Sequence, residues 1–240
     1  MSGPAAMKKP LRLLLVNPNS NPAVTALAAA AAERVLHSGM AAKAVEPEGG
    51  PLSIETLDHR RVAEPLAIDL LAHHPGYDAY AMACFDDIAL GAGRRFLDRP
   101  IVGSAEAALA IARCFAPRVA IVTTVETMVP GIRAQLSAMG ADGWCTVRAA
   151  GIGVADAADG GGTVEARIDD AIVKARDIDG AGVIILGSGG LTGRAVGLAR
   201  KHRLPVIDSI EAAVGMAELA ARLVQGQRAA DPALPGAASP

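Results

Sequence analysis

The sequence is poor in aromatic residues and in net charge. Phe, Trp and Tyr make up only 2% of its 240 residues, and the formal net charge is −2. A surface that binds nucleic acid needs a basic face and often stacking rings, so we expect no nucleic-acid partner. No apolar run approaches the roughly 18 residues that span a bilayer, so we expect no membrane partner.

Cysteine and histidine are also scarce. Cys84, Cys114 and Cys145 form no Cys-x-x-Cys pair, and the five histidines lack ligand spacing. This pattern disfavours a disulfide scaffold and a structural zinc site. Near the start, "MKKPLRLLLVNPNS" imitates a signal peptide, but its apolar run is short and "NPNS" stands where a cleavage site should follow. We interpret this segment as the first strand of a cytoplasmic protein.

Hydrophobic residues nevertheless make up 51% of the chain, and apolar strand-like runs alternate with helical stretches. Strands that are apolar on both faces and separated by helices indicate a parallel sheet covered on both sides. The sequence therefore predicts an α/β fold. The predicted strands are 11–16, 41–45, 77–84, 101–103, 119–124, 146–152, 183–187 and 206–208. The predicted helices lie near 22–37, 62–74, 87–97, 104–115, 128–139, 163–177, 191–203 and 209–225.

An internal repeat is the most informative feature. "RPIVGSAEAALAIA" (99–112) matches "LPVIDSIEAAVGMA" (204–217), and both contain the pattern S-x-E-A-A. Upstream of the two copies, Cys84 and Ser188 fall at equivalent positions. Chance similarity between alanine-rich helices is the alternative, but strand, turn and helix agree in order.

The repeat predicts two similar α/β halves. Asn17 and Thr123 then both lie at a strand end. The predicted division is 11–100 with 209–226 for the first half, 101–208 for the second, and flexible termini at 1–10 and 227–240.

Two such halves usually meet across a pseudo-two-fold axis, with the ligand at the carboxyl ends of the strands. Cys84 and Ser188 would then face one another across a shared cleft. Inverting a carbon that bears an acidic C–H requires removing a proton from one face and returning it on the other. A helix N-terminus after Cys84 would lower the thiol pKa, and the Gly187–Gly190 turn would donate N–H groups to an enolate.

Several motifs together resemble the Asp/Glu/hydantoin racemases, most closely the hydantoin and allantoin racemases. They are "VNPNS" (16–20), "GPLSIE" (50–55), "ACFDD" (83–87), "PIVGSAEAA" (100–108), "VTT" (122–124), "LGSGGL" (186–191) and "PVIDSIEAAV" (205–214). The resemblance runs from about residue 11 to 226. It implies two flavodoxin-like halves, a cofactor-independent site in the cleft between them and two catalytic cysteines.

Cys84 matches the first of those cysteines, but the second family motif departs from its usual form. Gly-Cys-Ala-Gly or Gly-Cys-Gly-Gly is expected, and Gly187-Ser188-Gly189-Gly190 is found. We predict Cys84 and Ser188 as the catalytic pair and no metal or cofactor. The predicted substrate-binding residues are Asn17, Phe85, Thr123, Thr124, Gly187, Gly189 and Gly190.

Each of these residues also has a plainer interpretation. Cys84 is otherwise a small buried apolar residue, as we expect of Cys114 and Cys145. The remaining polar residues would be structural. Asn17 and Asn19 would be helix caps, Asp86 and Asp87 charges at a helix N-terminus, Thr123 and Thr124 caps, and Ser188 a turn residue. A serine hydroxyl is inert as a base unless another group activates it.

The sequence thus predicts a cofactor-independent racemase of a hydantoin, allantoin or related small molecule, limited by its missing second thiol. Arg94 and Arg194 are the candidates for binding a substrate carboxylate. A single-cysteine decarboxylase, a cis-trans isomerase of small carboxylic acids and a non-catalytic ligand-binding homologue are the alternatives. "GSGGLTG" imitates a dinucleotide-binding turn, but its glycine spacing does not fit. We also expect a homo-oligomer.

Overall fold

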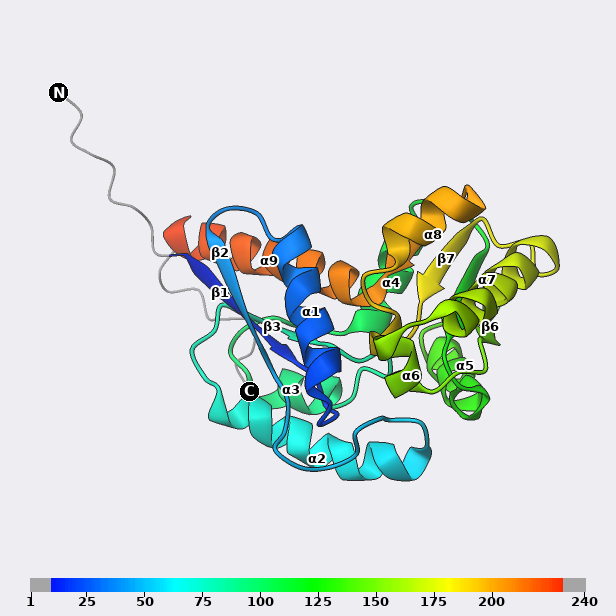
Figure 1. The fold of residues 1–240 in the computed structure, drawn as a ribbon. Helices are drawn as coiled ribbons and strands as arrows, with labels where there is room; N and C mark the ends of the chain where they lie inside the picture. The colour runs from blue at the N-terminus through cyan, green and yellow to red at the C-terminus, as the bar shows by residue number, and fades with distance from the viewer. Residues whose placement is uncertain (1–9, 231–240) are drawn as a thin grey trace.

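A computed structural model describes residues 10–230 and contains two parallel four-stranded sheets (Figure 1). Each sheet has the same strand order, β2-β1-β3-β4 in the first and β6-β5-β7-β8 in the second. The predicted α/β class is therefore confirmed. The strands are β1 (Leu11–Val16), β2 (Met40–Val45), β3 (Ala79–Met82), β4 (Ile101–Val102), β5 (Val119–Thr123), β6 (Cys145–Ala149), β7 (Val183–Leu186) and β8 (Val206–Asp208).

The helices lie close to their predicted positions, with differences where local backbone geometry forbids a helix. Asp87 and Ala89 have positive φ angles of 49° and 65°, so the helix predicted from residue 87 begins at Leu90. A short helix over 154–159 was not predicted. The helices are α1 (Pro22–Val35), α2 (Leu57–His73), α3 (Leu90–Phe96), α4 (Ser104–Ala112), α5 (Val129–Ala138), α6 (Val154–Asp159), α7 (Gly162–Asp177), α8 (Ala195–His202) and α9 (Ser209–Ala230), with single 3₁₀ turns at Glu126–Met128 and Gly189–Leu191.

The inner strands β1, β3, β5 and β7 are buried on both faces, which explains why they are almost continuously apolar. In β1, Leu13 and Leu15 belong to a central core between the two sheets, whereas Leu14 and Val16 pack under α2. This alternation is the two-residue period of a strand. The second sheet repeats the arrangement, because Ile121 faces the central core and its neighbours face α7.

Helices α4 and α9, which carry the repeated S-x-E-A-A pattern, each pack against the sheet of the other half. Helix α4 follows the first sheet but packs on β7 and β8, and α9 follows the second sheet but packs on β1, β3 and β4 (Figure 1). Their alanines are buried in the central core, including Ala108 and Ala213. Small side chains let both helices approach the sheets closely, so the repeat marks the junction of the halves.

The structure differs from the predicted organisation in two details. Ile101–Val102 pairs with β3 in the first sheet, although the predicted boundary assigns residues 101–208 to the second half. We therefore propose dividing the halves after Val102. Residues 227–230 form the end of α9 and are helical, whereas the rest of the predicted flexible ends, except Pro10, lies outside the described residues. No helix within 10–230 is long and apolar enough to cross a membrane.

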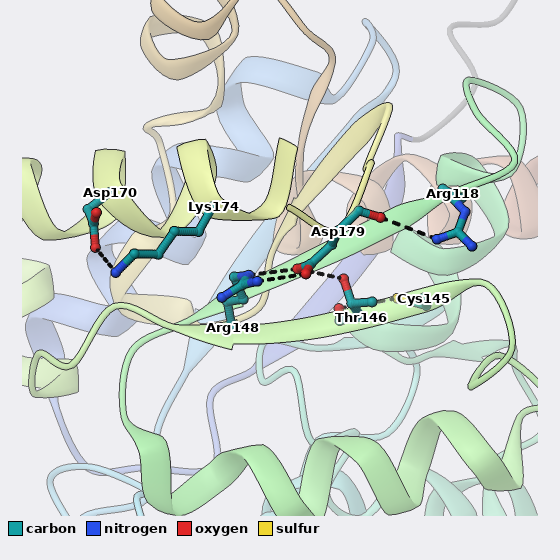
Figure 2. Close-up of polar contacts among 7 residues, drawn as sticks. All are labelled: Arg118, Cys145, Thr146, Arg148, Asp170, Lys174 and Asp179. Atoms are coloured by element: carbon teal, nitrogen blue, oxygen red, sulfur yellow. Dashed lines mark hydrogen bonds and ion pairs between the residues drawn. The ribbon is translucent and has the colours of Figure 1, made fainter. Parts of the chain in front are cut away.

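A polar cluster ties β6 to the loop before β7 (Figure 2). Arg148 donates two 2.6 Å hydrogen bonds to Asp179, and Thr146 adds a third at 3.3 Å. The guanidinium holds the pKa of Asp179 below its usual value. Cys145, at the start of β6, is buried, and burial raises its pKa to about 12. Cys114 is exposed, so its predicted core position is wrong.

Candidate functional site

A pocket that is partly open to solvent lies where β3, β5 and β7 end. Parallel sheets bind ligands at these carboxyl ends because loops there leave backbone groups free. Both halves contribute. The lining residues are Asn19, Val24, Ile54, Ala83, Cys84, Phe85, Asp86, Thr123, Thr124, Met128, Ile132, Val154, Gly187, Ser188 and Gly189.

Cys84 lies in the loop between β3 and α3. The loop begins with the N–H of Ala83 donating to the carbonyl of Val16. It turns where the N–H of Asp87 donates to the backbone carbonyl of Cys84 at 3.1 Å. Because α3 begins only at Leu90, Cys84 does not lie at a helix N-terminus. The predicted helix that was to lower the thiol pKa is therefore not in place.

The pKa of Cys84 is instead raised well above its ordinary value. Burial is the main cause, because the pocket wall desolvates the thiolate, and the negative charge of Asp86 adds to it. The backbone N–H of Asp86 acts in the opposite direction. The expected low pKa of Cys84 is therefore wrong, because burial and the charge of Asp86 both favour the neutral thiol.

Asp87 has a structural role. Its carboxylate accepts hydrogen bonds from the N–H groups of Ala105 (3.1 Å) and Glu106 (3.3 Å) and so caps α4. A Cβ at Gly103 would lie 2.4 Å from this carboxylate, so only glycine fits there. Burial raises the pKa of Asp87 to about 7.

Ser188 lies in the loop after β7, supported by both predicted threonines. Thr124 donates to the Ser188 hydroxyl at 3.4 Å, and Thr123 donates to the carbonyl of Gly187 at 3.1 Å. Gly187 must be glycine because a Cβ would lie 2.4 Å from Ile121.

Two predicted residues do not line the pocket. Asn17 is completely buried, and its side-chain amide donates to Asn19 (2.9 Å) and Thr25 (3.0 Å). It therefore orients Asn19, which does line the pocket. Gly190 is buried against α6, where a Cβ would lie 2.5 Å from the carbonyl of Val154.

Hydrogen bonds between the halves hold the pocket together. Glu55 lies in the loop before α2. Its carboxylate accepts from the N–H of Val154 at 2.8 Å, and its backbone carbonyl accepts from the hydroxyl of Thr127 at 2.7 Å. In the same direction, Gln135 of the second half donates to the carbonyl of Phe85 at 3.3 Å. These contacts connect the "GPLSIE" loop and the Cys84 loop to the second half.

The pocket carries no cationic side chain among the described residues. Arg94 pairs with Glu106, and Arg194 pairs with Glu165 at 2.9 Å and also donates to backbone carbonyls. Neither of these candidate carboxylate-binding arginines lines the pocket. Arg60 acts on Cys84 and Asp86 only through its charge.

Comparison with known families matches residues 13–217 to the family described as Asp/Glu/Hydantoin racemase. The chain belongs to this family. The hydantoin racemase of Rhizobium meliloti is 34% identical over 211 residues, which cover 87% of this chain and 88% of the relative.

Solved structures in the same family have the same fold. The allantoin racemase from Klebsiella pneumoniae superposes with a TM-score of 0.85 at 34% identity, covering 89% of this chain and 88% of that one. The allantoin racemase from Pseudomonas fluorescens also gives 0.85, at 29% identity, covering 89% and 92%.

Sequence reasoning missed part of the pocket of this racemase-family chain. Asp86 was interpreted as a helix charge and Asn19 as a cap. The apolar wall was not predicted, because buried apolar residues give no signal that separates pocket from core. For Asp86, its place two residues after Cys84 was the available signal. The other missed residues are Val24, Ile54, Ala83, Met128, Ile132 and Val154.

Proposed function

We propose that this racemase-family enzyme inverts the carbon next to a carbonyl in a hydantoin, allantoin or related cyclic ureide, with Cys84 as the proton-transfer group. One observation carries the proposal. Cys84 and Ser188, at equivalent positions of the two halves, line a single pocket that has no cationic side chain. A neutral ring bearing an acidic C–H suits such a pocket better than an α-carboxylate does.

The reaction needs only proton transfers. The neutral Cys84 thiol first loses its proton to solvent. The resulting thiolate takes the proton from carbon, so that the C–H bond breaks, an S–H bond forms and the electron pair moves onto the carbonyl oxygen. The N–H groups of Ser188 and Gly189 have no acceptor within the described part of the chain, which supports a role for them in stabilising this enolate. Returning the proton to the opposite face completes the inversion.

Ser188 makes the second step the difficult one. A hydroxyl is a much weaker acid than a thiol, so we infer that proton return from the Ser188 side limits racemisation. Return from Cys84 itself gives exchange with retention of configuration. The enzyme should therefore exchange the C–H of one enantiomer faster than it racemises it.

The test is proton-exchange NMR in deuterium oxide after exhaustive EDTA dialysis, with no cofactor added. The substrates are both enantiomers of 5-methylhydantoin, allantoin, aspartate, glutamate and maleate, and protein-free samples are the control. We expect exchange and slower racemisation for a hydantoin or allantoin. Turnover of maleate or an amino acid alone would favour the carboxylic-acid alternatives, and activity that required an added metal would contradict the thiol mechanism.

A cytoplasmic location and a homo-oligomeric assembly stay predictions from the sequence. Analytical ultracentrifugation of the purified chain tests the second.

A further inference from the structure

Two neighbouring aspartates after Cys84 differ in how their carboxylates are satisfied. Asp87 accepts two backbone hydrogen bonds from α4. Asp86 is equally buried, with 7% of its surface exposed, but its Oδ2 has no hydrogen-bond partner in the described part of the chain. Buried polar atoms are almost always hydrogen-bonded, so an unpartnered one needs a separate explanation.

The fold does not use Asp86 to support itself. Helix α3 begins four residues later, so the side chain caps no helix there. The equivalent position in the second half is Gly190, two residues after Ser188, so the repeated architecture does not need a carboxylate. Asp86 lines the pocket, and a ligand in that pocket is the partner its oxygen lacks.

We propose that Asp86 is a specificity-determining residue that accepts a hydrogen bond from the N–H adjacent to the reacting carbon of the substrate. The inference rests on the proposed function for the identity of that carbon. In a hydantoin the reacting carbon, C5, is flanked by the N1–H and by the C4 carbonyl. In the proposed placement the C–H points at Cys84, N1–H contacts the Cys84 loop, and the C4 carbonyl contacts the N–H groups of the Ser188 loop.

The same carboxylate selects against other substrates. A carboxylate on the reacting carbon would meet the buried Asp86, and two acidic groups in one desolvated site repel each other. No described cation lines the pocket, and Arg60 acts on Asp86 only through its charge. N–H donors instead gain a charge-assisted hydrogen bond. Asp86 therefore favours ureide rings over free amino acids and malonates.

The test compares the Kd values of 5-methylhydantoin with those of its N1-methyl and N3-methyl derivatives. A hydrogen bond to a charged group typically corresponds to about 10- to 100-fold in affinity. We expect wild-type protein to prefer the parent over the N1-methyl compound by about that factor. The preference should shrink in Asp86→Asn, whose neutral oxygen still accepts, and vanish in Asp86→Ala. The affinity for the N3-methyl compound relative to the parent should be the same in all three proteins.

Asp87→Asn is the matched control, since asparagine keeps a cap on α4 and the side chain lies outside the pocket. It should keep the wild-type preference. Two results would overturn the assignment. One is equal affinity of the wild-type protein for the parent and the N1-methyl compound, absence of binding included. The other is a preference for the parent over the N1-methyl compound that is unchanged in Asp86→Ala. Racemisation is measured in parallel. Selective binding without turnover would contradict the proposed function alone, and turnover with unchanged selectivity would contradict the role of Asp86 alone.

Discussion

The loops after β3 and β7 hold equivalent places in the two sheets. Val16 pairs with Met82, and Val122 pairs with Leu186, so Cys84 and Ser188 each lie two residues beyond their strand. The next residues differ. The first loop continues with Phe85, Asp86 and Asp87, whereas the second continues with Gly189, Gly190 and Leu191.

This difference divides the work of the pocket. The first loop supplies a thiol and a carboxylate, and the second supplies a hydroxyl and glycine backbone. Two sheets of the same strand order thus present different groups to the pocket, and we propose that the first loop carries the acid–base groups and the second the neutral hydrogen-bond donors. The comparison predicts that substitutions at equivalent positions have unequal effects.

Cys84→Ser should have the largest effect. Replacing the only thiol of the pocket removes the proton-transfer group, and positioned acid–base groups typically contribute about 10²- to 10⁴-fold in rate. We expect a loss near the upper end in C–H exchange for both enantiomers, measured by NMR. Cys114→Ser, at an exposed position, is the control and should exchange normally. Residual exchange within tenfold of wild type would remove Cys84 from the mechanism.

Ser188→Cys should act in the opposite direction. A thiol at the equivalent position of the second loop supplies the missing acid, so the rate of racemisation, measured by polarimetry, should rise by about 10²-fold. Exchange of the slow enantiomer should rise with it, because its C–H points toward position 188. Ser188→Ala is the control for a change of size. If racemisation stayed unchanged in a folded Ser188→Cys protein, position 188 would not be the second proton-transfer site.

Much of this comparison could be predicted from the sequence. The S-x-E-A-A repeat exists because buried alanines let α4 and α9 approach the sheets, so a packing constraint left a visible pattern. The paired positions of Cys84 and Ser188 followed from the same repeat.

The electrostatics of the first loop could not be predicted. The positive φ angles of Asp87 and Ala89 delay α3, and nothing in the local sequence separates that turn from a helix start. The partner of Asp87, the α4 N-terminus, lies almost twenty residues away in sequence. The pKa of Cys84 depends on burial by both halves, which only the assembled fold defines.

The thiol pKa gives a third way to test the comparison. Because burial and Asp86 raise the pKa of Cys84, its thiolate fraction should still be rising across the range from pH 8 to 10. A free thiol of ordinary pKa, about 8.5, levels off within that range. Iodoacetamide alkylation of Cys84, followed by peptide mapping, measures the profile. Asp86→Asn should move it to lower pH, and a plateau below pH 8 in wild type would contradict the burial argument.

The smallest expected effects concern how each half caps its exchanged helix. Asp208 accepts hydrogen bonds from Gly193 (2.6 Å), Ile210 (3.0 Å) and Glu211 (3.3 Å), whereas Asp87 accepts two from α4. Loss of a cap costs about 0.5–2 kcal/mol. We expect about 2 kcal/mol for Asp208→Ala and about 1 kcal/mol for Asp87→Ala in urea unfolding, because the third donor is also left unpaired.

The pH dependence sharpens this last difference. The folded-state pKa of Asp87, about 7, lies above its unfolded value of about 3.9, so folding favours the protonated form. Its contribution to stability is fully present below about pH 4 and is lost as the pH rises through 7. Asp87→Ala lacks this loss, so its destabilisation relative to wild type should be greater at pH 5 than at pH 8. A destabilisation that grew between pH 5 and pH 8 would show that the carboxylate is stabilised by α4 more than it is penalised by burial.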